Sequence, residues 1–188
     1  MTRFKSNMHT LKDLGPIKAF INTPLAYLCV RELLLASDSP NCQVYVIATN
    51  PASMRQIKDL ASKDDDVKVN VILSGFGTGL TRKLRSITKL LIARIRLTFA
   101  LRAIKSQDQI VVSHLGNPYT RLVLERCMRA GVRAIAVDDG TATLTDHDAF
   151  ARDGALTACS GKKRLTTALA RAEMLLFSTA TIPADQIS

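Results

Sequence analysis

Five short apolar runs alternate with four longer helical segments between Ile17 and Gly140, and this alternation limits the possible folds most strongly. The predicted strands are 17–22, 43–48, 67–73, 109–113 and 132–137, and the predicted helices are 24–37, 51–62, 80–105 and 118–130. Pro24, Pro51 and Pro118 suit helix starts, and Gly131 suits a helix end. The spacing is typical of βαβ units, so we predict an α/β fold with a Rossmann-like parallel sheet and helices on both faces.

The fifth apolar run ends in two adjacent acids, Asp138 and Asp139, followed by Gly140. In an open α/β sheet, ligands bind outside the carboxyl ends of the strands. Neighbouring side chains on a strand point to opposite sides, so one acid can face a cleft while the other holds the loop. Gly140 can adopt a positive φ and turn the chain sharply away. A catalytic pair and a turn or capping role are both open from these residues alone.

The chain has 188 residues, enough for one domain with a substantial core. We expect a loose tail over 1–15, the Rossmann-like domain over 16–150, and a connector with the start of a second unit over 151–188. Within the last part, 145–157 is expected as a loop, 162–175 as a helix and 176–181 as the start of a strand.

The net charge of +10 predicts attraction to an anion, such as nucleic acid, an acidic membrane surface or a sugar nucleotide. Aromatic residues make up only 5% and tryptophan is absent, which argues against a base-stacking surface and hence against nucleic acid. The sequence has no apolar run of about 18 residues and no secretory signal pattern, so we expect a cytoplasmic protein. A peripheral position on the inner membrane and a homodimer both stay open.

The four cysteines form no CxxC pair, which gives no support for a zinc site. Cys29 and Cys127 lie in predicted helices, and Cys42 opens a predicted strand. We expect these thiols to be reduced and to fill small apolar spaces. The acidic run Asp64-Asp65-Asp66 is interpreted as a solvated turn, and no metal or other cofactor is expected.

The predicted helix 80–105 carries eight basic residues and no acid. Its expected core stripe is formed by Leu80, Leu84, Ile87, Leu91, Ile95 and Thr98, broadened by Leu90, Leu97 and Leu101. A solvated basic face over this stripe is one interpretation, and a helix lying on an anionic membrane surface is the other.

A glycine-rich turn, Gly75-Phe76-Gly77-Thr78-Gly79, precedes this helix. Such a turn can cradle a phosphate at Gly75, Gly77 and Gly79, or it can serve as a flexible connection. Neither GxGxxG nor the Walker spacing is present. The phosphate interpretation would make the chain a nucleotide-dependent enzyme of another type.

The segment Val137-Asp138-Asp139-Gly140-Thr141 resembles the acidic-acidic-glycine motif of bacterial sialyltransferases, most closely the lipooligosaccharide group called glycosyltransferase family 52. The segment Ile21-Asn22-Thr23-Pro24-Leu25 and the order of elements from Ile17 to about Leu144 are also similar. The resemblance implies the N-terminal, acceptor-side half of a GT-B enzyme that transfers sialic acid from CMP-sialic acid to a terminal sugar of a surface glycan.

The resemblance also implies roles for individual residues. Asp139 would be the general base that takes the acceptor hydroxyl proton, with Asp138 in support, and no metal would be needed. The expected substrate-binding residues at the strand ends are Asn22, Thr23, His114, Asn117, Gly140 and Thr141. His114 either lines the cleft or bonds a loop carbonyl, and His147 is expected in a solvated loop.

One departure from the family pattern concerns the donor. The family carries a His-Pro motif in its C-terminal half, whereas His9, His114 and His147 are followed by Thr, Leu and Asp. We therefore expect this chain alone to bind the nucleotide donor poorly and to turn over slowly. The alternative function is a non-catalytic Rossmann-like binding module.

Overall fold

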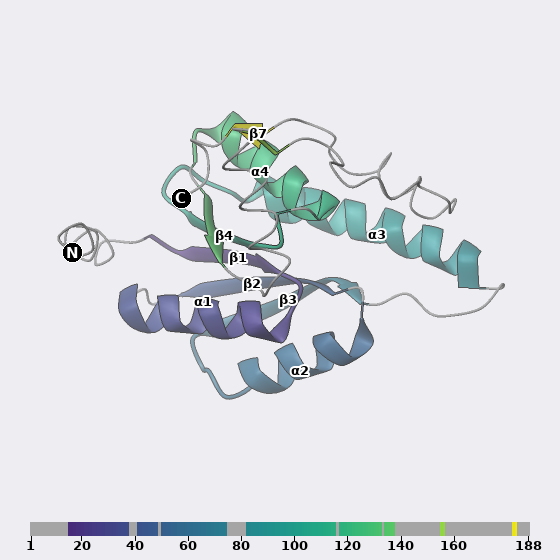
Figure 1. Ribbon diagram of the computed structural model, residues 1–188, viewed down its shortest axis with the longest axis horizontal. Coiled ribbons are helices and arrows are strands. Elements are labelled where there is room, and N and C mark those ends of the chain that lie inside the picture. The colour runs from purple at the N-terminus through teal and green to yellow at the C-terminus, as the bar shows by residue number, and fades with distance from the viewer. Residues whose placement is uncertain are drawn as a thin grey trace.

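The computed structural model describes residues 15–37, 41–48, 50–74, 82–115, 117–132, 134–137, 155–156 and 182–183. It contains a five-stranded parallel sheet between two layers of helices (Figure 1). The five strands are β1 (Ile17–Ile21), β2 (Cys42–Ala48), β3 (Val67–Ser74), β4 (Gln109–Ser113) and β5 (Ala134–Val137). The helices are α1 (Pro24–Ser37), α2 (Pro51–Ala61), α3 (Arg82–Arg102) and α4 (Pro118–Ala130). The predicted Rossmann-like α/β fold is confirmed.

The strand order is β3-β2-β1-β4-β5, and every neighbouring pair is parallel. The chain adds strands outward from β1 to β3 on one side and then returns to place β4 on the other side of β1. The order therefore reverses between β1 and β4. In open α/β sheets, the crevice at such a switch point is the usual place for a ligand.

Each face of the sheet has its own apolar core. One face packs against α1 and α2 through Tyr27, Val30 and Ile57, which are buried. The other face packs against α3 and α4, where Leu97 and Tyr119 are buried. Figure 1 shows the two pairs of helices on opposite sides of the strands. Because both faces are covered, the strands are apolar on both sides, as parallel strands usually are.

Residues at the helix ends explain why the helices begin and end where they do. Asn50 and Asn117 cap α2 and α4, because each side-chain oxygen accepts a hydrogen bond from a backbone N–H in the first turn. Proline follows both caps. Gly131 ends α4 with φ of 66°, a left-handed conformation that glycine adopts without strain. The predictions that Pro51 and Pro118 start helices and that Gly131 ends one are confirmed.

The predicted core stripe of α3 is wrong in part. Leu90, Leu97 and Leu101 are buried as expected. Leu91 and Ile95, however, are exposed, and Thr98 is only half-buried. The side chains of Leu80, Leu84 and Ile87 lie outside the description. Helical spacing alone fits two apolar faces in this helix, and only packing on the sheet decides which of them is covered.

A buried ion pair closes the amino edge of the sheet on the α3 and α4 side. The Lys18 ammonium in β1 lies 2.6 Å from the Asp108 carboxylate, and both side chains are buried. Lys18 also donates to the carbonyl of Ala103, and Asp108 accepts from the backbone of Lys105 at 2.7 Å. The pair therefore ties the connection between α3 and β4 to the central strand.

Further short elements and contacts surround this frame. Gly15, the last residue of the expected tail, lies so close to the Gln107 carbonyl oxygen that an added Cβ would stand 2.1 Å from it. Two short antiparallel strands, β6 (Ala155–Leu156) and β7 (Ile182–Pro183), pair with each other. The former falls where a loop was expected. The predicted helix 162–175, strand start 176–181 and loop residue His147 lie outside the described residues. No described helix has both the length and the apolar character needed to cross a membrane.

Candidate functional site

The ends of β1 and β4 are joined by a hydrogen bond at the switch point. The Ser113 hydroxyl at the end of β4 donates to the side-chain oxygen of Asn22, directly after β1, at 2.9 Å. Ser113 is buried, and its carbonyl accepts from the Thr120 hydroxyl of α4 at 2.9 Å. These contacts fix the two strand ends side by side, so the backbone at this edge is preorganised.

Two helices, α1 and α4, begin at the switch point, and each is capped by a residue that we predicted to bind substrate. The Thr23 hydroxyl accepts from the backbone N–H of Ala26 at 3.1 Å, and the Asn117 side-chain oxygen accepts from that of Tyr119 at 2.9 Å. The positive ends of the α1 and α4 dipoles therefore face the switch point. Thr23 and Asn117 serve first as helix caps, although the Asn117 amide group still carries N–H donors.

His114 follows β4 in a strained backbone conformation. Its φ is 53°, in the left-handed region that residues other than glycine seldom adopt. Its carbonyl accepts from the backbone of Asn117 at 3.0 Å, which closes the turn into α4. The imidazole is half-buried. Strain of this kind is common at functional sites, where the surrounding structure holds it in place.

The strand that precedes the acidic pair ends beside this turn. In the parallel pairing of β4 and β5, Val137 lies opposite Ser113. Asp138, Asp139, Gly140 and Thr141 lie outside the described residues. The structure brings Asn22, Thr23, His114 and Asn117 to one edge, and β5 ends at that edge too.

The predicted phosphate turn follows a different strand. Gly75, Gly77 and Gly79 lie outside the described residues. The preceding strand, β3, stands at one end of the sheet and is separated from β1 by β2. It therefore does not border the switch point between β1 and β4.

Sequence reasoning missed two residues near the site. Ser113 joins the strand ends, and a serine closing an otherwise apolar run was the available signal. Arg121 lies in the first turn of α4, and it is only 6% exposed. A charged group is buried only where polar or charged neighbours compensate the loss of hydration. Because basic residues are frequent throughout the chain, the sequence does not indicate that Arg121 is buried.

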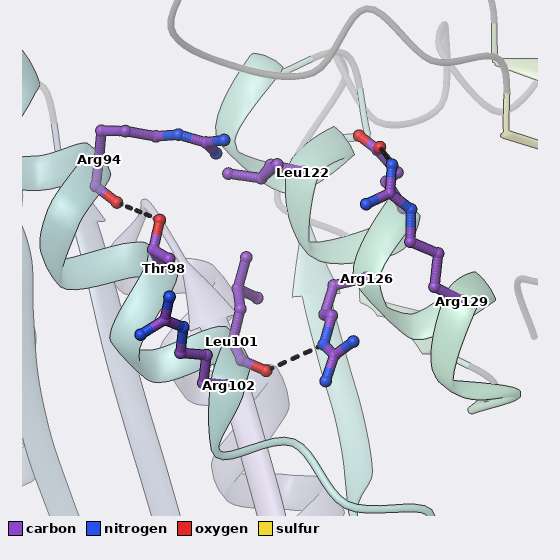
Figure 2. Close-up of a pocket in the computed structure, with 8 residues that line it drawn as sticks. Arg94, Thr98, Leu101, Arg102, Leu122, Arg126 and Arg129 are labelled. Atoms are coloured by element: carbon purple, nitrogen blue, oxygen red, sulfur yellow. Dashed lines mark hydrogen bonds and ion pairs between the residues drawn. The ribbon is translucent and has the colours of Figure 1, made fainter.

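Two of the cavities lined by described residues lie away from the switch point. One, of about 320 Å³, lies between α3 and α4 and is lined by Arg94, Arg102, Arg126, Arg129 and Glu125 among others (Figure 2). The other, of about 290 Å³, lies where the end of α1 meets the turn before β3. There, Asp64 accepts from the Tyr27 hydroxyl at 2.6 Å and pairs with Arg31 at 3.1 Å. Asp64 therefore links that turn to α1, a structural use of the acidic run.

Ionisable groups with shifted pKa values belong to the core, away from the switch point. Burial raises the pKa of Cys42 and of Cys127 to about 12 in each case. Burial and the hydrogen bond to Asp64 raise the pKa of Tyr27.

The placement of Cys29 and Cys127 in helices and of Cys42 at a strand start is confirmed, and none of these three forms a disulfide. In the part of the chain that the structure describes, no cluster of three His, Cys, Asp or Glu residues could hold a metal ion.

Comparison of the sequence with protein-family models gives no match, and comparison with curated proteins gives none either.

Proposed function

We propose that this chain is the acceptor-side domain of an inverting glycosyltransferase that resembles the bacterial sialyltransferases of family 52. One observation carries the proposal. The switch point between β1 and β4 has a preorganised edge, and the strand beside it, β5, runs in the sequence directly into Asp138-Asp139-Gly140. Acids that follow a strand at this edge are suited to act on a ligand in the crevice.

In the proposed reaction, an acceptor sugar hydroxyl attacks the anomeric carbon of the sialyl group. A new carbon–oxygen bond forms, and the bond to the phosphate oxygen breaks, so CMP leaves with the electron pair. The carboxylate of Asp139 takes the hydroxyl proton as the attack proceeds. Asp138 supports the loop that follows.

The helix N-termini at the switch point and the net charge of the chain fit an anionic donor. CMP-sialic acid carries a phosphate and a carboxylate, and the N-termini of α1 and α4 favour negative charge nearby. The net charge of +10 adds a general attraction for anions. The strained turn at His114 supports a role in ligand contact, since it lies between the end of β4 and the cap of α4.

A second candidate function, a non-catalytic Rossmann-like binding module, is favoured by a specific observation. The side-chain oxygens of Asn22, Thr23 and Asn117 all accept hydrogen bonds from within the protein. These contacts explain the three residues without any substrate. The two candidates therefore differ at the acidic pair, which only the enzyme requires.

An NMR titration of the isotope-labelled chain with a panel of surface oligosaccharides tests acceptor binding. The backbone signals of Asn22, Ser113 and His114 should shift, because these residues lie at the switch point. The signals of α2, which follows β2 and does not begin at the switch point, serve as an internal control and should stay in place. Shifts confined to other parts of the chain, or no shift with any oligosaccharide, would contradict an acceptor site at this edge.

A further inference from the structure

The outward side of α3 carries a row of large apolar side chains. Leu91, Ile92, Ile95 and Phe99, which we call the outer ridge, are between 43% and 63% exposed. Their spacing along the helix places them on one face, opposite the buried Leu90 and Leu97. A helix that is apolar on both faces is normally covered on both. One face of α3 packs on the sheet, whereas the outer ridge faces away from it.

Positive charge surrounds the outer ridge. Exposed Lys89 and Arg96 lie on one flank, Arg94 and Arg102 lie toward α4, and α3 contains no acid. The guanidinium of Arg102 stands over the ring of Phe99, 5.7 Å from its centroid, so charge and apolar surface adjoin. A surface that is apolar along its centre and cationic on both flanks matches the boundary between the acyl chains and the headgroups of an anionic bilayer.

The cavity between α3 and α4, which we call the arginine groove, borders the ridge. Figure 2 shows Arg94 and Arg102 on α3 and Arg126 and Arg129 on α4 around it. Four arginines with Glu125 as the single acid among its lining residues leave a net charge of +3. Glu125 already pairs with Arg129, and Arg126 is held in place by its donation to the carbonyl of Leu101 at 3.3 Å. Guanidinium groups are well suited to phosphate oxygens.

We propose that α3 is a membrane-docking helix, whose outer ridge enters the interface of an anionic phospholipid bilayer while the arginine groove receives lipid phosphates. The ridge supplies burial of apolar area, and the flanking basic residues supply attraction to the charged surface. A protein surface would need a matching acidic and apolar face, whereas an anionic bilayer offers both properties everywhere. Docking would hold the sheet beside the membrane.

The absence of tryptophan from the chain provides a direct assay. The variant Phe99→Trp places a single fluorophore on the ridge, and Leu35→Trp places one on exposed α1 as the matched control. With vesicles of phosphatidylcholine and phosphatidylglycerol, the emission of the ridge variant should shift to the blue and that of the control should not. Pure phosphatidylcholine should give a much weaker shift. High salt should reduce the response, because it screens the attraction.

Two further double substitutions distinguish the contribution of the basic residues to binding from that of the outer ridge. Adding Arg102→Gln and Arg129→Gln should weaken binding to the anionic vesicles roughly 20- to 30-fold, since each basic residue near such a surface strengthens binding about fivefold. The same change in charge on α2, Arg55→Gln with Lys58→Gln, should weaken it much less. Three results would overturn the proposal: no shift with either vesicle, equal shifts with both, or a concentration-dependent shift without lipid, which would indicate a second copy on the ridge.

Discussion

At the residue scale, a buried charged pair joins two parts of the chain that lie far apart in the sequence. Lys18 and Asp108 form an ion pair between β1 and the connection after α3, with both side chains almost fully buried. Nothing in the sequence near either residue indicates the pairing, because the two are brought together only when β1 and β4 become neighbours. Contacts of this kind depend on topology and cannot be derived from local pattern.

Replacing Lys18 by methionine should lower the free energy of unfolding by about 3 kcal/mol, since the carboxylate of Asp108 would stay buried without its partner. The same substitution at exposed Lys58 on α2 is the control and should change stability by less than about 0.5 kcal/mol. Urea denaturation of both variants gives the comparison. Small and equal losses of unfolding free energy in the two variants would show that the ion pair contributes little to stability.

The buried thiols should be unreactive in the folded protein. Because burial raises the pKa of Cys42 and Cys127 to about 12, almost no thiolate forms at pH 8, whereas Cys29 is partly exposed. Alkylation mapped by mass spectrometry should therefore modify Cys29 well before the other two. Similar rates at Cys29 and Cys42 in the native protein would contradict this burial.

The same shifts predict how stability changes with pH. Below about pH 9 both the folded and the unfolded chains keep these thiol protons, so the contribution is fully present. Between about pH 9 and pH 12 the unfolded chain releases protons that the folded chain retains, and the free energy of unfolding falls. The variant Cys42→Ala should show a smaller fall across this window than the unmodified chain.

At the scale of elements, the helix ends were the most predictable features and the helix faces the least. Helix starts are marked by Asn50-Pro51 and by Pro118, and the end of α4 is marked by Gly131. These boundaries depend on local hydrogen bonds and backbone conformation, so sequence patterns are enough to predict them. The covered face of α3 was misjudged at Leu91 and Ile95, because both apolar faces have helical spacing. Which face is covered depends on how the helix lies on the sheet.

The two asparagine caps allow a matched test of the site. Asn117→Ala and Asn50→Ala should each lower stability by about 1 kcal/mol, since each removes one capping bond. Only the Asn117 variant should also weaken oligosaccharide binding, because α4 begins at the switch point and α2 does not. Equal effects of both variants on binding would place the acceptor elsewhere.

At the scale of the whole molecule, the proposed chemistry and the proposed membrane contact lie on two different surfaces. The carboxyl edge between β1 and β4 is the proposed place of chemistry, and the outer side of α3 is the proposed membrane contact. The parallel sheet could be predicted from the strand and helix alternation. The hydrogen bond between Ser113 and Asn22 could not, because it joins residues 91 positions apart in the chain.

The most direct test of the proposed function is a single-turnover assay of sialyl transfer from CMP-sialic acid, comparing the unmodified chain with Asp139→Asn at high protein concentration. The unmodified chain should transfer the sialyl group slowly to an oligosaccharide that binds it. The asparagine variant should be slower by about 10²- to 10⁴-fold, the range for loss of a general base, with an unchanged melting temperature. Equal rates for the two proteins, or no transfer above a heat-denatured control, would contradict the account.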